Sequence, residues 1–99
     1  MTQSADIVAT VRIAPDHPSL PGHFPANPIV PGVVLLDRIA AAIERVGDRR
    51  LARIDSVKFL APLKPGEEAE LRIARDGARV RFRIDRDGAP ILRGEGEIA

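Results

Sequence analysis

The sequence predicts an α+β domain in which a curved antiparallel β-sheet wraps around one central α-helix. Three observations predict this fold class: one strand-like segment near the start, a single segment with apolar residues at helical spacing, and four strand-like segments separated by turn signals. Only the helix offers enough apolar surface to cover the inner face of the sheet, so we expect the sheet to curve around it. Because 99 residues are too few for two ordinary domains, we predict one domain over residues 1–99.

The composition excludes several classes of protein. Hydrophobic residues make up 44% and charged residues 29%, which is typical of a globular protein and not of a disordered one. A net charge of +1 and only three aromatic residues, all phenylalanine, argue against nucleic acid as a partner. The absence of cysteine excludes disulfides, thiolate zinc sites and cysteine nucleophiles. We find no signal peptide and no apolar run long enough for a membrane span, so we expect a cytoplasmic protein.

Apolar residues predict the first strand, and prolines predict the loop that follows it. Residues 6–13 are rich in β-branched apolar side chains and predict a strand. Residues 14–31 hold six of the nine prolines. Proline fixes its own φ and pushes the preceding residue toward extended conformations, so this stretch is predicted to be a rigid loop. A long ordered loop in so small a domain is usually functional, and both histidines, His17 and His23, fall inside it.

Residues 32–46 predict the helix. Their apolar side chains form one stripe at about 100° per residue: Leu35, Leu36, Ile39, Ala40, Ile43 and Val46. Gly47 follows directly and is predicted to end the helix as a left-handed cap. On the helical wheel Asp37 lies at the edge of the polar arc, next to the side that carries Val33 and Ala40.

Four strands are predicted after the helix, over residues 51–60, 69–74, 79–85 and 91–98, and we expect them to form an antiparallel meander. Turn signals separate them at residues 63–66 (LKPG), at Asp76-Gly77 and at Asp87-Gly88. The alternation is cleanest in residues 79–84, which places Val80, Phe82 and Ile84 on one face and three arginines on the other. One face of the sheet is therefore expected to be buried and the other exposed.

The segment HPSLPGHFPANPIVPG, residues 17–32, carries an imidazole on a stiff loop that leads directly into the helix. A helix N-terminus presents unpaired N–H groups and the positive end of the helix dipole, so the N–H of Gly32 or its neighbours could bind a developing oxyanion. About one and a half turns further along, Asp37 supplies a carboxyl group beside apolar side chains. The segment therefore offers a base in His23, an oxyanion donor in Gly32 and an acid in Asp37.

These residues resemble a known family. The pattern GHFPxxPxxPGV over residues 22–33, followed by Asp37, resembles the active-site signature of the hot-dog-fold β-hydroxyacyl-acyl carrier protein dehydratases, and the 14-residue spacing from His23 to Asp37 fits it. Residues 57–66 resemble the strand and turn that follow the helix in that family. The short chain, the opening His17-Pro18 and the Asp at the acid position look most similar to the dehydratase-like group associated with aryl polyene pathways. The general dehydratases are longer and carry Glu at that position.

The resemblance implies a hot-dog fold and a dehydratase that acts on 3-hydroxyacyl thioesters in fatty acid or polyene biosynthesis. His23 would remove a proton from C2, the Gly32 N–H would polarise the thioester carbonyl, and Asp37 would help the C3 hydroxyl leave as water. An apolar acyl tunnel would keep Asp37 protonated, because it destabilises the charged carboxylate. The resemblance also implies a homodimer whose subunits contribute the histidine and the acid to each site, an acyl carrier protein as partner, and no cofactor or metal.

Two other functions stay open. A hot-dog thioesterase would use an acidic helix residue to activate water, although His23 in the dehydratase loop argues against it. A non-catalytic acyl-binding subunit would pair with another dehydratase-like chain, although the intact His23, Gly32 and Asp37 argue against lost activity. Without the motif, His23 would be read as a structural loop histidine and Asp37 as a solvated residue near a helix N-terminus.

Two groups of arginines are candidates for docking the acidic carrier protein by complementary charge. Arg49, Arg50 and Arg53 follow the helix, and Arg79, Arg81 and Arg83 line one strand face. Such rows are usually solvated surface, and the sequence does not choose between the two groups.

Overall fold

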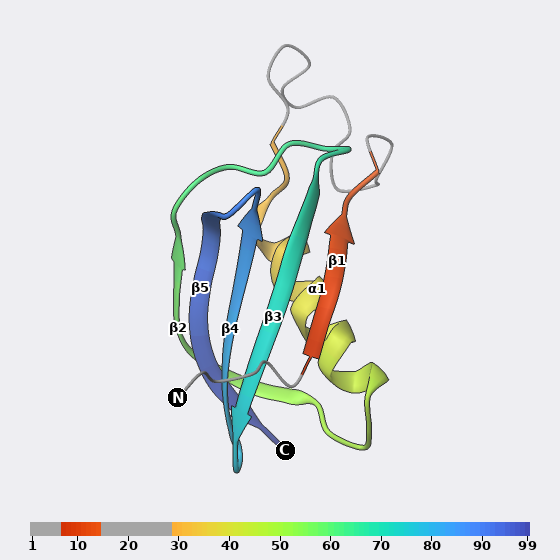
Figure 1. Cartoon of the computed structure of the whole chain (residues 1–99). Helices are drawn as coiled ribbons and strands as arrows, with labels where there is room; N and C mark the ends of the chain where they lie inside the picture. The colour runs from red at the N-terminus through yellow and green to blue at the C-terminus, as the bar shows by residue number, and fades with distance from the viewer. Residues whose placement is uncertain (1–6, 15–28) are drawn as a thin grey trace.

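The structure, a computed structural model, describes residues 7–14 and 29–99. His23, His17 and Phe24 lie outside the described residues. The elements follow in the order β1 (Ile7–Arg12), α1 (Gly32–Arg45), β2 (Leu51–Phe59), β3 (Glu68–Asp76), β4 (Arg79–Arg86) and β5 (Ala89–Ile98). Each predicted strand and the predicted helix are present, with ends that differ from the prediction by at most a few residues. Figure 1 shows the helix against one face of a curved sheet, as expected.

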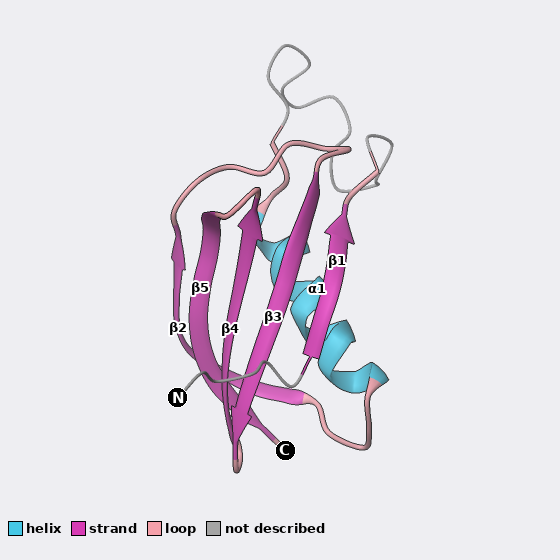
Figure 2. Cartoon of the chain, viewed as in Figure 1, coloured by secondary structure: helices cyan, strands magenta, loops and turns pink. Residues whose placement is uncertain are grey.

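The strand order corrects the predicted meander. The five antiparallel strands run β1-β3-β4-β5-β2 across the sheet, so only β3, β4 and β5 form a meander (Figure 1). β2 pairs with β5 at one edge, and β3 pairs with β1 near the other. The physical reason lies in the link between β2 and β3. Residues 60–67 contain two prolines and are too long for a tight hairpin, so the chain crosses the end of the sheet instead (Figure 2).

The two tight turns are those that the sequence predicted. The first turn joins the paired residues Asp76 and Arg79, and Gly77 is the first of its two central residues. Its φ of +61° is positive, as a type II′ turn requires at this position. Asp87 and Gly88 both have positive φ, 50° and 80°, as a type I′ turn requires. These turns fix the register of the β3-β4-β5 meander.

The crossing segment, residues 60–67, is tied to the segments that flank the proline-rich loop. Leu63 is 1% exposed and its carbonyl accepts a hydrogen bond from the N–H of Val30 at 2.8 Å, while the N–H of Gly66 donates to the carbonyl of Ile13 at 2.8 Å. The Glu67 carboxylate accepts the Lys64 N–H at 2.8 Å and also binds Arg86. The hydrogen bond from the Lys64 N–H contributes most to lowering the pKa of Glu67, and the interaction with Arg86 lowers it further. The position of Val30 fixes where the helix begins, two residues later.

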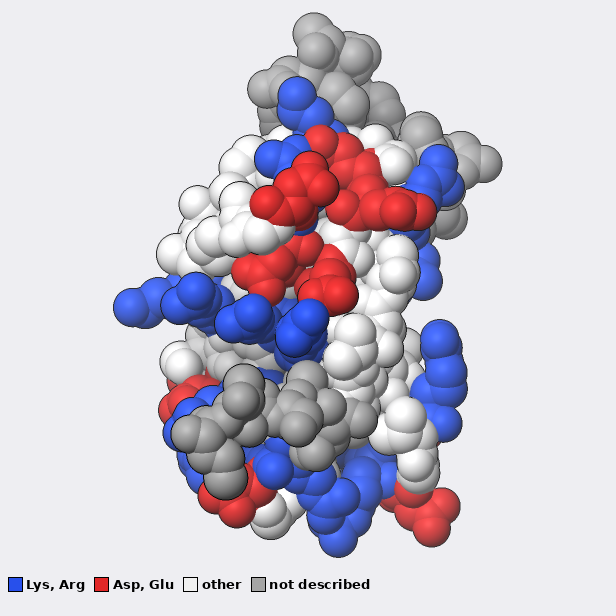
Figure 3. Space-filling view, in the orientation of Figure 1, with Lys and Arg blue, Asp and Glu red and all other residues white. Residues whose placement is uncertain are grey.

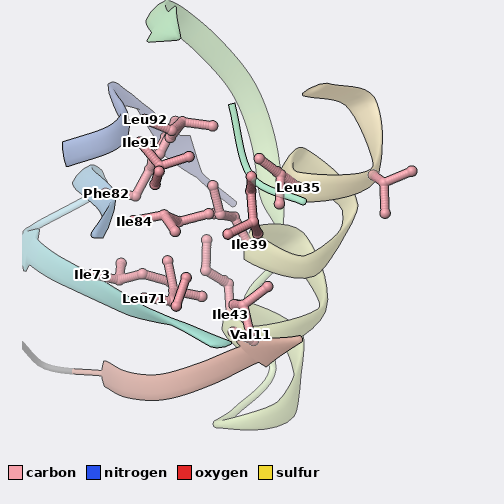
Figure 4. Packing of buried hydrophobic residues seen from close by; sticks show 14 of the residues in the cluster. Val11, Leu35, Ile39, Ile43, Leu71, Ile73, Phe82, Ile84, Ile91 and Leu92 are labelled. Carbon is pink, nitrogen blue, oxygen red and sulfur yellow. The ribbon is translucent and has the colours of Figure 1, made fainter. Parts of the chain in front are cut away.

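The core lies between α1 and the inner face of the sheet. On β4 the predicted pattern is confirmed, because Val80, Phe82 and Ile84 are buried and the arginines between them are exposed. Figure 4 shows side chains of the helix pointing at those of the strands. The buried helix residues are Val34, Leu35, Ile39, Ala42 and Ile43. Each fully buried aliphatic side chain of this kind stabilises the fold by about 1.5–3 kcal/mol.

The C-terminal end of the helix differs from the prediction. Leu36 and Ala40 are only partly buried, and Val46 is 66% exposed, so the apolar stripe turns away from the sheet before its predicted end. Gly47 has no positive φ and is not a left-handed cap. The helix ends at Arg45, because the N–H of Val46 donates to the carbonyl of Ile43 at 3.4 Å and tightens the last turn.

Ile39→Ala tests the packing of the helix. Ile39 is 0% exposed, so we expect the free energy of unfolding to fall by about 2–5 kcal/mol, from lost burial and from the cavity left behind. Urea unfolding followed by circular dichroism measures it. Val46→Ala, at a position that is 66% exposed, is the control and should change stability by less than about 1 kcal/mol. Equal losses of stability in the two variants would contradict the burial of Ile39 in the core.

Candidate active site

Gly32 is the first residue of α1, and no side chain of the described residues caps the N-terminus of this helix. Pro31 is the N-cap residue, with φ −59° and ψ 141°, and it makes no capping hydrogen bond. The N–H of Val34 donates to the carbonyl of Pro31 at 3.0 Å. The N–H groups of Gly32 and Val33 lie in the first helical turn and have no acceptor within the helix. They are therefore donors at the positive end of the helix dipole, as the sequence predicted for an oxyanion.

Phe59, which the sequence pattern alone did not single out, lies directly against Gly32. A Cβ added to Gly32 would lie 2.6 Å from both Cε1 and Cζ of the Phe59 ring. Phe59 is the last residue of β2 and remains 51% exposed, so its ring shields one side of Gly32 from an otherwise open surface. The only sequence signal for it was its place in residues 57–66, which resemble the family pattern. The contact explains why the first helical residue has no side chain.

Asp37 lies on the face of the helix that turns away from the core. It is exposed, and its neighbours one turn away are Val33, which is 62% exposed, Ala40 and Ala41. The carboxyl group thus belongs to a mostly apolar face that nothing in the described chain covers. This agrees with the predicted position of Asp37 beside Val33 and Ala40.

Gly32 and Asp37 lie on the same helix but are offset along and around it. Five residues of helix separate them by about 7.5 Å along the axis and by about 140° around it. The predicted base, His23, lies outside the described residues, so its distance from either group stays a prediction. Within the described ranges no cluster of His, Asp or Glu could hold a metal ion. In the same part of the chain, no helix has the length and apolar character needed to cross a membrane.

Comparison with known proteins gives consistent results. The sequence model of the ApeI-like family, described as ApeI dehydratase, matches residues 1–95. A 3-hydroxyacyl-[acyl-carrier-protein] dehydratase, FabZ, from Anaeromyxobacter sp. (strain K) is 34% identical over 79 residues, which are 68% of this chain and 51% of that protein. The chain therefore spans about half the length of this relative, and 56% of the FabZ from Geobacter metallireducens.

Solved structures confirm the fold. The dehydratase heterocomplex ApeI:P from Xenorhabdus doucetiae contains a chain that superimposes with a TM-score of 0.83 at 26% identity, over 98% of this chain and 89% of that one. The (R)-hydratase from A. caviae involved in PHA biosynthesis gives a TM-score of 0.73 at 18% identity, over 98% and 96% of the two chains. The predicted hot-dog architecture, an antiparallel sheet around one helix, is confirmed.

The contact between Gly32 and Phe59 predicts a change of sign in a mutant cycle. In the wild-type background Gly32→Ala should lower the free energy of unfolding by about 1–3 kcal/mol, because the new methyl group collides with the ring. In a Phe59→Ala background the same change should be neutral or stabilising by up to about 1 kcal/mol, because alanine favours the helix. Urea unfolding of the four variants measures the coupling. Identical effects of Gly32→Ala in both backgrounds would contradict the contact.

Proposed function

The chain belongs to the ApeI-like dehydratase family, and on this premise we propose that it eliminates water from a 3-hydroxyacyl thioester carried on an acyl carrier protein, giving a trans-2-enoyl thioester. The observation that carries the proposal is the uncapped helix N-terminus at Gly32, with the carboxyl group of Asp37 on an apolar face of the same helix. The FabZ relatives are named for this reaction.

Each step of the elimination has a residue to perform it. The C2–H bond beside a thioester is only weakly acidic, so a base of near-neutral pKa needs the carbonyl to be polarised as the proton leaves. His23 takes this proton, and the N–H of Gly32 donates a hydrogen bond to the carbonyl oxygen as the negative charge develops. The electron pair then returns to form the C2–C3 double bond. The C3–O bond breaks, and Asp37 donates its proton to the departing hydroxyl, which leaves as water.

The carboxyl group of Asp37 has to give up a proton in this step, and a single chain leaves it open to water. The carboxyl group is exposed beside Val33 and Ala41, on a face that no other described element covers. A second subunit packed over this face would exclude water from the carboxyl group. It would also bring groups of a second chain to Asp37.

β2 is the strand at which a second subunit would attach. It lies at the edge of the sheet, and seven of its nine residues are exposed, on both faces. Exposed apolar side chains gather in and just after it: Ile54 is 37% exposed, Phe59 51% and Leu60 50%. A free, partly apolar edge strand is a template for pairing with another chain. We therefore propose a homodimer joined edge to edge through β2, with Gly32 and Phe59 near the junction.

His23→Ala and Asp37→Asn test the chemistry. In an assay with a 3-hydroxyacyl thioester on carrier protein, each variant should lose at least about 100-fold in kcat, because each removes a proton-transfer group. Asp48→Asn is the control, because Asp48 is an exposed carboxylate beyond the end of the helix. Folded variants of His23 and Asp37 that turn over at the wild-type rate would disprove the assignment.

Ile54→Lys tests the dimer. A lysine at the centre of β2 brings like charges together across the junction, so the mass measured by light scattering should fall from about twice 10.7 kDa toward the single-chain value. Val46→Lys adds the same charge to an exposed apolar position at the far end of α1 and should leave the dimer intact. A wild-type chain that is monomeric alone would contradict the homodimer. Such a chain would then pair with a different one, in a heterocomplex such as ApeI:P.

A further inference from the structure

Four cations form one cross-strand row on the outer face of the sheet, the face away from α1. Arg72 on β3 is opposite Arg83 on β4, Arg83 is opposite Arg93 on β5, and Arg93 is opposite Lys58 on β2. Figure 3 shows this band of positive side chains crossing the sheet, with acidic side chains beside it. Like charges directly opposite each other destabilise a sheet. The row is therefore unfavourable for the isolated fold.

A second row on the same face shows the arrangement that favours stability. Asp76 is opposite Arg79, Arg79 is opposite Glu97, and Glu97 is opposite Arg53, so the signs of the charges alternate across the same four strands. The ion pair between Arg53 and Glu97 is formed at 3.0 Å. Stability of the sheet alone therefore does not explain the all-positive row, which we call the basic row: Arg72, Arg83, Arg93 and Lys58.

The basic row borders a hollow whose positive charge is not neutralised. The hollow has a volume of about 580 Å³, and its lining includes the basic row and Arg81. Arg72 binds Glu70 at 2.7 Å and Arg83 binds Asp85 at 2.9 Å. Lys58, Arg81 and Arg93 have no ion pair within residues 7–14 and 29–99. The single carboxylate in the lining, Glu95, is held by Arg79 at 3.0 Å.

The shape of the charge distribution limits the occupant. The cations are spread along a line over four strands and do not converge on one point, as they would around a single phosphate. On one side the row is flanked by Glu70 and Asp85, which are opposite each other in register, so a wide polyanion such as duplex nucleic acid would overlap these acids. A second copy of the same face does not supply free carboxylates for the row, because its Glu70 and Asp85 are already bound to arginines of their own chain.

We propose that the basic row docks an acidic helix of a partner protein, laid across the strands. Neighbouring strands are about 4.7–4.9 Å apart, and one turn of helix rises about 5.4 Å. Carboxylates at positions i, i+4 and i+7 of a helix therefore fall over successive cations of the row, with little drift over four strands. Such a docked helix neutralises Lys58 and Arg93 and offsets the repulsion between the strands.

This inference rests on the proposed function for the identity of the partner, which is then the acyl carrier protein. It favours the second of the two groups of arginines that the sequence left open, because Arg81 and Arg83 line the hollow. In the first group, Arg49 and Arg50 follow the helix, and Arg53 is paired with Asp55 and Glu97. The β2 end of the basic row also lies close to the candidate active site. Lys58 directly precedes Phe59, whose ring lies against Gly32.

The test measures binding of a phosphopantetheinylated acyl carrier protein to the full chain by isothermal titration calorimetry at low salt. Arg81→Glu/Arg93→Glu breaks no ion pair of the described chain and should raise Kd at least about tenfold. Arg49→Glu/Arg50→Glu makes the same change of charge at the other group and should alter Kd less than about twofold. Wild-type binding should weaken as salt is added.

A kinetic measurement separates this inference from the proposed function. Arg81→Glu/Arg93→Glu should lower kcat/KM for the carrier-bound 3-hydroxyacyl substrate about tenfold and leave turnover of the corresponding N-acetylcysteamine thioester unchanged. Normal carrier affinity in this variant, weaker affinity in Arg49→Glu/Arg50→Glu, or no carrier binding by the wild-type chain would overturn the docking surface. Binding that depends on the row without dehydration of either substrate would overturn the proposed function alone.

Discussion

One helix has to cover the inner face of a five-stranded sheet, and its packing against that face is the constraint on which the remaining structure depends. Leu35, Ile39 and Ile43 are at most 3% exposed and lie against buried residues of the strands. A helix is about 10–12 Å wide, whereas five strands span about 19 Å. A single helix therefore cannot cover the whole inner face, and in this chain the edge strand β2 is left exposed. The incomplete cover leaves room for the second subunit that we propose.

The same constraint places the site at the margin of the core. The helix begins where Val30 is tied to Leu63 of the crossing segment, which positions Gly32 beside the end of β2. The buried stripe of the helix leaves the opposite face, with Asp37 and Val33, uncovered. The proposed oxyanion donor lies at the N-terminus of the helix, and the proposed acid lies on the helix face that turns away from the core. We propose that a complete site takes groups from two chains, in agreement with the subunit arrangement that the family resemblance implied.

Local features of the fold were predictable from the sequence, and tertiary ones were not. The alternation of Val80, Phe82 and Ile84 predicted a half-buried strand, and the Asp-Gly pairs predicted both tight turns, because these signals depend on adjacent residues. The pairing of β2 with β5 and the contact of Phe59 with Gly32 join segments far apart in the chain, and no local pattern records them. The basic row needs the register of four strands, so the sequence showed arginines on β4 but not their alignment with Lys58.

The central claim is that the dehydratase site is shared between two copies of the chain. Subunit complementation tests it most directly: His23→Ala and Asp37→Asn, each inactive as a homodimer, are unfolded together, refolded in equal amounts and assayed for dehydration. If each site takes its histidine from one subunit and its acid from the other, half of the dimers are mixed and each mixed dimer holds one intact site. The mixture should then regain about a quarter of the wild-type activity. A mixture in which mixed dimers form but no activity returns would contradict the shared site.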